Sequence, residues 1–468
     1  MSGTTRLGVF GIGLAAYWPQ FEGLKAAIEQ HLAHIEDRVG AWGTVVSAGV
    51  VDTAESGACA GDRFAAERVD LLLCYAGTYA TSTQVLPVAQ RAGVPVILLN
   101  LQPEVALDYE TVDTRGWLEN CGVCPIPELA GVFQRTGVPY RIITGHLHSD
   151  EVAWGEIEAW CRVVAAARTL QRGRFGMLGH TYPGMIDMST DVGIVAGQLG
   201  AHVEILEMED LRDRVRSKGY KRVPEIEVTA RRRFAIFDNI SHQALVSATR
   251  IAGALCSLVD DYALDGLAYY YRGSGGDEIE QLASNMILGN TLLTTDGIPA
   301  AGEGDLKTAL AMKLMHGLGA GGSFTEFAAM DFHENFFLMG HDGPAHLGIS
   351  DGEAVLKSLA VFHGKAGGGL AVEMRAQTGP VTVLGMTQTR DGRLKLVAAE
   401  GESLPGPVPR IGNSLHRIRF GGDLRGWFEA WCATGPTHHV ALGLGHRRSD
   451  IEKAAWLLGL ELDVVRAQ

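Results

Sequence analysis

The regular alternation of short apolar runs and amphipathic stretches along the first third of the chain most constrains its fold. Runs of this length are typical of buried strands, and the stretches between them have helical periodicity, so the pattern predicts parallel strands covered by helices. We expect an open α/β domain over residues 1–172, with Phe21–Glu36 as one of its helices. Its predicted strands are Leu7–Phe10, Thr44–Val51, Leu71–Tyr75, Val94–Asn100 and Tyr140–Thr144.

The same rhythm begins again after a helix predicted from about Asp150 to Arg172. It indicates a second open domain over residues 173–324, because strand-length apolar runs again alternate with helical stretches. The predicted strands are Phe175–Leu178, Val203–Glu207 and Leu267–Tyr271, and the predicted helices are Asp191–Leu199 and His242–Tyr262.

Short β-like segments with frequent turn signals begin at about residue 325. They include Val381–Gln388, Leu394–Glu400 and Arg410–Phe420, a spacing that predicts a small, mostly antiparallel sheet or barrel. We expect this C-terminal β-rich domain, residues 325–468, to end in a helix at Ser449–Leu458. The predicted fold class is therefore α/β, with two open parallel-sheet (Rossmann-like) domains followed by a β-rich C-terminal domain.

The formal net charge of −14 argues against a nucleic-acid partner, because phosphate binding requires clustered Lys and Arg. No stretch offers ~18 uninterrupted apolar residues, so no membrane span is expected. The seven cysteines are scattered, which favours a reducing compartment over a disulfide framework. Because the N-terminus also lacks a secretory pattern, we expect a cytoplasmic protein.

The densest cluster of chemically active side chains lies between Ala300 and His346. It contains Glu303, Glu326 and His341, and His438 and His439 follow later, after a Gly-Pro turn. Carboxylates together with imidazoles form a ligand set for a hard or borderline divalent ion. Each residue also has a simpler interpretation: Glu303 could cap a helix at Asp305–Met315, and a single histidine could be a core residue. Taken together, the residues favour a metal site.

Four segments resemble the L-arabinose isomerases, and they occur in the order of that family. Ala301–Ala309 is similar to its AGEGDWKTA segment, and Ser323–Glu326 resembles its SFMED, with Phe327 in place of the final acid. Gln377–Pro380 matches a QTGP segment of the third domain, and Gly435–Val440 is similar to GGAHHTV.

The resemblance implies a soluble aldose–ketose isomerase of the arabinose/fucose isomerase type. Glu303, Glu326, His341 and His439 would hold a divalent ion, Mn²⁺ or another such as Mg²⁺ or Co²⁺. Asp342 or His346 could replace His341 as the third ligand. Glu303 and Glu326 would also be the catalytic acid and base, acting through a cis-enediol. Assembly as a homo-oligomer, a trimer or hexamer, is implied as well.

The identity of the sugar stays open, because the resemblance weakens where substrate would bind. The family's NQTAHG loop, which reaches a neighbouring subunit's site, corresponds here to Glu119–Pro125. The expected sugar contacts are Tyr17, Gln20, Tyr271 and His438. Two alternatives remain on the same scaffold: a metal-dependent epimerase or lyase of a sugar, polyol or sugar acid, and a non-catalytic sugar-binding protein.

Two further motifs are weaker. Gly11–Ala16 fits a loose dinucleotide-binding pattern, but Trp18-Pro19 falls where the phosphate-binding helix would begin, and the residue before proline is biased away from helix. Cys121 and Cys124 form a C-x-x-C without a second Cys or Cys/His pair at zinc-finger spacing. We expect them to lie in a loop with free thiols.

Overall fold

The computed structural model describes residues 5–217, 219–236, 240–272, 277–359 and 369–466. The contacts divide the chain into two compact units, Met1–Arg168 and Thr169–Gln468, and each is described by itself. The boundary between these units falls inside helix α6 (Glu151–Gln171), and the predicted domain boundary at residue 172 stays a prediction.

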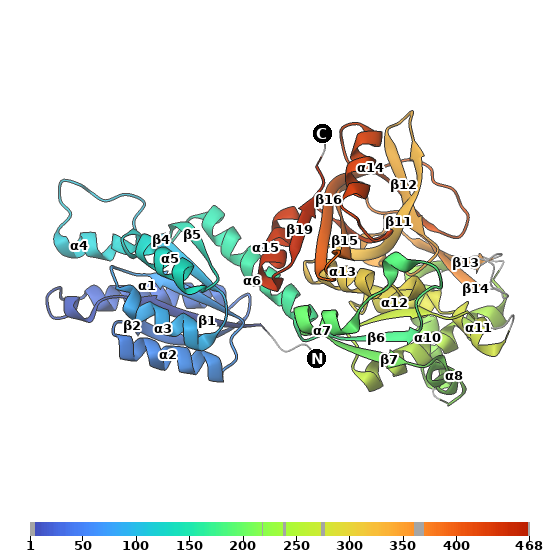
Figure 1. The fold of residues 1–468 in the computed structure, drawn as a ribbon, viewed down its shortest axis with the longest axis horizontal. Coiled ribbons are helices and arrows are strands. Elements are labelled where there is room, and N and C mark those ends of the chain that lie inside the picture. The colour runs from blue at the N-terminus through green and yellow to red at the C-terminus, as the bar shows by residue number, and fades with distance from the viewer. Residues whose placement is uncertain (1–4, 218, 237–239, 273–276, 360–368, 467–468) are drawn as a thin grey trace. The chain divides into compact units, whose positions relative to one another are not determined.

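The first unit is an open sheet of five parallel strands in the order β2-β1-β3-β4-β5 (Figure 1). β3 is buried along its whole length, as expected of a strand covered by helices on both faces. Helices α2, α3 and α5 share one hydrophobic cluster with the sheet. All five predicted strands are present, at β1 (Arg6–Ile12), β2 (Thr44–Val51), β3 (Leu71–Ala76), β4 (Val96–Gln102) and β5 (Tyr140–His146). The helices are α1 (Leu24–Val39), α2 (Ala54–Ala66), α3 (Ser82–Ala92), α4 (Thr114–Glu119) and α5 (Pro125–Thr136).

The second unit begins with a parallel sheet in the order β10-β9-β6-β7. Its strands are β6 (Arg174–Gly179), β7 (His202–Leu206), β9 (Gly266–Tyr270) and β10 (Ala300–Ala301), which confirms a second parallel sheet. The helices of this region are α7 (Val192–Leu199), α8 (Met208–Ser217), α9 (Gly219–Arg233), α10 (His242–Tyr262), α11 (Glu278–Ala283), α12 (Ile287–Thr295) and α13 (Leu306–Gly317). A small sheet, β14-β13-β8, joins β8 (Phe234–Ile236), β13 (Ala354–Leu359) and β14 (Gly369–Glu373).

The β-rich part of this unit is a sheet of seven strands in the order β15-β18-β11-β12-β17-β16-β19. β15 also pairs with β16, so the sheet curls back on itself like a barrel. Its strands are β11 (Gly321–Asp331), β12 (Phe336–His341), β15 (Gly379–Gln388), β16 (Leu394–Leu404), β17 (Ser414–Arg419), β18 (His439–Leu444) and β19 (Glu461–Val464), and its helices are α14 (Leu424–Ala433) and α15 (Arg448–Leu458).

The prediction that a helix is the last element of the C-terminal region was wrong. β19 follows α15 and pairs in parallel with β16. β19 has only four residues, too few for a period to be recognised in the sequence, and its pairing with β16 defines it as a strand.

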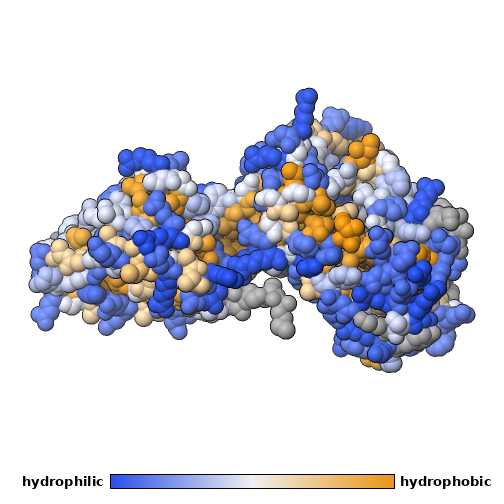
Figure 2. All heavy atoms as spheres, turned by 60° about the horizontal axis from the view of Figure 1, so that its bottom comes forward, coloured by the Kyte–Doolittle hydropathy of each residue, from blue (hydrophilic) through white to orange (hydrophobic). Residues whose placement is uncertain are grey.

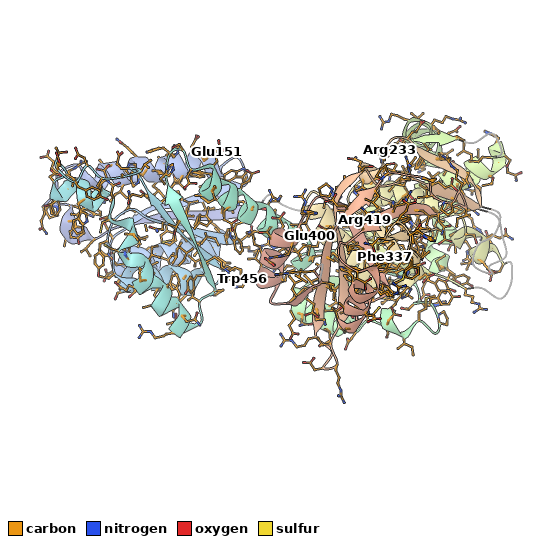
Figure 3. All side chains as sticks on the ribbon, turned by 90° about the horizontal axis from the view of Figure 1, so that it is seen from above. Glu151, Arg233, Phe337, Glu400, Arg419 and Trp456 are labelled. Atoms are coloured by element: carbon orange, nitrogen blue, oxygen red, sulfur yellow. The ribbon has the colours of Figure 1, made fainter. Side chains whose placement is uncertain are left out.

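One hydrophobic core joins the helical and barrel parts of the second unit. Leu245 and Ala252 of α10 belong to the same buried cluster as Val381 and Val440 of the barrel. Phe337 on β12, labelled in Figure 3, lies in this cluster. The predicted division of this region into domains at residue 324 stays a prediction.

Hydrophilic side chains are spread over both units on the face shown in Figure 2, with smaller apolar areas between them. Among the described residues, no helix combines the length and the hydropathy that crossing a membrane requires.

Candidate metal centre

The four predicted ligands come from four segments of the second unit. Glu303 lies in the 3₁₀ turn η4 (Gly302–Gly304), Glu326 in β11, His341 at the end of β12 and His439 at the start of β18. The strand register places Glu326 directly opposite His439 on one side and Gly340 on the other. Neighbouring strands therefore bring together residues that are far apart in the sequence.

Two groups of possible ligand atoms meet here, and within each group the ligand atoms all lie within 4.8 Å of one another. The first contains Glu326, His341 and His439, and the second contains Glu303, His438 and His439. His439 belongs to both, so the other three predicted ligands, Glu303, Glu326 and His341, each lie near its buried imidazole. The buried Phe324 ring packs against His341 and His439, with centroids 4.7 and 4.3 Å away, and restricts how these imidazoles can turn.

The backbone at Glu303 is strained. Its φ of 59° and ψ of 11° lie in the left-handed region, which few residues other than glycine adopt. The Tyr182 N–H donates to the Glu303 carbonyl at 2.9 Å and helps to hold this turn. Such strain persists only where the surrounding structure imposes it, and it is common at functional sites.

Asp305, rather than Glu303, caps helix α13. Its carboxylate accepts from the Thr308 N–H at 3.0 Å and from the Thr308 hydroxyl at 2.8 Å. It also lies 3.1 Å from Nδ1 of His439, so a proton on Nδ1 is held by Asp305 and the lone pair of His439 is left on Nε2. Glu303 is therefore not the cap of this helix.

Two buried polar atoms at the centre face each other without hydrogen bonds. His439 Nε2 and Glu303 Oε2 lie 3.6 Å apart, and neither has a hydrogen-bond partner among the described residues. Leaving a buried polar atom unsatisfied costs about 1–3 kcal/mol, so such a pair requires an explanation. A cation between the two atoms would satisfy both, and the donor set therefore fits a divalent ion.

The protonation states of His439 and Glu303 also suit metal binding. Burial lowers the pKa of His439, which favours the neutral imidazole. Burial acts to raise the pKa of Glu303, but the neighbouring His438, His439 and His341 outweigh it, and the net effect lowers that pKa. A neutral imidazole and an ionised carboxylate are the forms that bind metals.

His341 meets the other ligands, whereas His346 does not. His341 Nδ1 lies 2.9 Å from Asp342 Oδ1 and accepts from the Gly343 N–H at 2.9 Å. Burial acts to lower the pKa of His341, but the carboxylates of Asp342, Glu326 and Glu303 outweigh it and raise that pKa. His346 Nε2 instead contacts His316 Nδ1 at 3.1 Å and belongs to neither group of ligand atoms.

Asp187, which the sequence analysis missed, holds His438. Its Oδ2 lies 2.6 Å from His438 Nδ1 and accepts from the His438 N–H at 3.1 Å. Interaction with Glu303, and then with Asp187, raises the pKa of His438 to about 9. Asp187 lies in the 3₁₀ turn η3 (Ile186–Met188), where no motif marks it.

Two cavities of unequal size adjoin the centre. The smaller, about 30 Å³, has room for little more than water and is lined by Tyr182, Tyr269, Tyr270, Tyr271, Ala283, Ile287, Gly302, Glu303, His341, Asp342 and Gly343. The larger, about 360 Å³, falls within the range of small-molecule sites. Its lining is Asp187, Glu326, Phe327, Phe428, Trp431, Cys432, Gly435, Pro436, Thr437 and His438.

The predicted sugar contacts are divided among these places. His438 lines the larger cavity and Tyr271 the smaller one. Tyr17, in the 3₁₀ turn η1 (Ala15–Tyr17), and Gln20 belong to the first unit. Their role as sugar contacts stays a prediction.

No family model matches the chain. L-arabinose isomerase from Acidothermus cellulolyticus is 26% identical over 389 residues, which cover 79% of this chain and 75% of that protein. L-arabinose isomerases from Nocardioides sp. and Klebsiella pneumoniae are each 25% identical, covering 80% and 79% of this chain and 76% of each relative.

A solved solute-binding protein of an ABC transporter from Agrobacterium vitis, bound with alpha-D-tagatopyranose, matches at 13% identity. The match covers 68% of this chain and 90% of that one, but its TM-score of 0.17 is too low to support any argument. The sequence relatives indicate an isomerase enzyme and support an arabinose isomerase-like family.

Proposed function

We propose that this protein is a divalent-metal-dependent aldose–ketose isomerase that acts on an open-chain sugar through a cis-enediol. The relatives named L-arabinose isomerase support interconversion of an aldose and a ketose. The observation that carries the metal dependence is the pair of buried, unpartnered atoms, Glu303 Oε2 and His439 Nε2.

Glu303, Glu326, His341 and His439 would hold the ion. Two carboxylates and two imidazoles suit Mn²⁺, and the same set accommodates Mg²⁺ or Co²⁺. When bound, the ion would supply a Lewis acid that polarises the carbonyl oxygen and the adjacent hydroxyl oxygen of the sugar.

Glu303 and Glu326 are the proposed proton carriers. One carboxylate removes the proton from C2 of the aldose and returns it to C1, while the other moves the proton between O1 and O2. Glu303 lines the smaller cavity and Glu326 the larger, so different environments surround the two groups. Such a difference allows two carboxylates to act as base and acid in the same reaction.

The larger cavity is the proposed sugar chamber, because the smaller has no room for a sugar. Glu326 and His438 provide polar groups at one part of its lining, and Phe327, Phe428 and Trp431 provide an aromatic wall. Aromatic rings suit the C–H face of a sugar. His438, which Asp187 holds in place, can donate a hydrogen bond to a hydroxyl of the sugar. The native ion and assembly as a trimer or hexamer stay predictions.

A substrate panel with metal-stripped protein tests the proposal. Pentoses, hexoses and tetroses are incubated with the protein with and without Mn²⁺, and ketose formation is measured beside Mn²⁺ binding. We expect turnover that requires Mn²⁺ and is lost in Glu303→Gln and Glu326→Gln. Glu429→Gln, an exposed position on α14, is the matched control and should keep full activity. Mn²⁺ binding without ketose from any sugar would refute the isomerase assignment.

A further inference from the structure

Two cysteines of the first unit lie in contact at the start of a helix. Cys121 belongs to the 3₁₀ turn η2 (Cys121–Val123), and Cys124 is the N-cap residue of α5. The Cys121 thiol donates to Cys124 Sγ with the two sulfurs 2.8 Å apart. The expectation of a loop is therefore corrected: one helical turn places residues three apart on the same face.

The surrounding structure fixes this turn. A Cβ at Gly122 would collide with the Ala76 carbonyl oxygen, so only glycine allows the turn to pack against the end of β3. Asn120, just before it, donates to the Gly116 carbonyl at 3.0 Å. On the other side, Leu129 and Phe133 of α5 are fully buried. The short distance between the sulfurs therefore comes from a rigid segment.

The two thiols differ in accessibility. Cys124 is exposed, whereas Cys121 is buried with 3% of its surface accessible. Cys124, at the start of α5 and in contact with the Cys121 S–H, is therefore the sulfur that a disulfide in solution can reach first. Burial raises the pKa of Cys121, so its thiol is the less reactive of the two.

We propose that Cys121 and Cys124 are a reversible thiol–disulfide site that reacts with low-molecular-weight disulfides of the glutathione class. The Cys124 thiolate attacks one sulfur of the glutathione disulfide, forms a mixed disulfide and releases one glutathione thiolate. Cys121 then loses its proton to solvent and attacks Cys124 Sγ, which releases the second glutathione. The protein loses two electrons and two protons, and the glutathione disulfide is reduced to two thiols.

The test uses the full-length protein with the exposed cysteines Cys59 and Cys432 replaced by serine. This protein is equilibrated with mixtures of reduced and oxidised glutathione, quenched with acid, alkylated and digested with trypsin. Arg115 and Arg135 bound one peptide that carries both Cys121 and Cys124 and no other cysteine. We expect this peptide to lose two hydrogens, to resist alkylation and to carry no glutathione, and reduction with a dithiol should restore it.

Single variants test the order of events. Cys121→Ser should trap one glutathionyl group on Cys124, whereas Cys124→Ser should leave Cys121 unmodified. Circular dichroism identifies a variant that fails to fold, and Cys121→Ala then replaces Cys121→Ser. A peptide that stays reduced at every glutathione ratio, or a stable glutathione adduct in the protein that keeps both thiols, would overturn the proposal. Sugar turnover is not part of this readout, so failure here is independent of the isomerase proposal.

Discussion

Asp305→Asn tests whether the carboxylate behind His439 prepares the centre for metal. The substitution keeps the shape of the side chain and its role as N-cap of α13, because asparagine caps as well as aspartate. It removes the negative charge that lies 3.1 Å from His439 Nδ1. The amide can also turn its NH₂ group towards Nδ1, which would place the imidazole proton on Nε2, the atom needed for the ion.

The expected loss is 10- to 100-fold in Mn²⁺ affinity, or about 1.4–2.7 kcal/mol, the scale for residues that orient a metal ligand. Calorimetric titration of metal-stripped protein measures the affinity, and thermal unfolding without metal measures stability. Asp423→Asn is the matched control, because Asp423 caps α14 through the Gly426 N–H at 2.8 Å and is exposed. The control should bind Mn²⁺ like the unchanged protein.

Unchanged Mn²⁺ affinity in Asp305→Asn would refute the argument that Asp305 orients His439. A large fall in the melting temperature of the metal-free variant, without a similar fall in the control, would show instead that Asp305 acts mainly through folding.

Three further predictions address other parts of the site and fold. Asp187→Asn should raise KM for the sugar roughly tenfold, the scale of one charge-assisted hydrogen bond, with Mn²⁺ affinity retained; an unchanged KM would contradict the role given to His438. Phe428→Ala should raise KM about 3- to 10-fold through loss of the aromatic wall, whereas Phe332→Ala, 57% exposed and outside the cavity lining, should not. Burial lowers the pKa of His416 to about 4 in the folded protein. As the pH falls below 6.5, the His416 imidazole therefore binds a proton in the unfolded chain before it does so in the folded protein. The free energy of unfolding should therefore decrease as the pH falls from 6.5 towards 4, by about 2 kcal/mol at pH 5 from this residue, and urea unfolding at pH 7 and pH 5 should show a smaller decrease in His416→Gln.

Local sequence patterns were sufficient for the five strands of the first sheet and for long helices such as α6 and α10. Leu71–Ala76 is apolar throughout and buried, so its strand could be recognised without knowledge of its neighbours. β19 has only four residues, too few to show such a pattern, and its pairing with β16 defines it. The C-x-x-C was expected in a loop because the tight packing of Gly122 against β3 cannot be read from the chain.

The candidate site, too, could be predicted from the sequence only in part. The residue types and order of Glu303, Glu326, His341 and His439 favour a divalent ion and resemble one enzyme family, because carboxylates and imidazoles are its natural ligands. Asp187 could not be found from the sequence, since it lies 251 residues from His438, its partner.

The sequence by itself determined which side chains are available for metal and proton chemistry, and that short β segments follow residue 325. Only the tertiary structure decided which of their atoms meet: the register of β11 with β18, the strained turn at Glu303 and the cap at α13 direct Nε2 of His439 towards Glu303. The physical reason is that local propensity acts over a few neighbouring residues, whereas the packing of one shared core fixes contacts between segments more than a hundred residues apart.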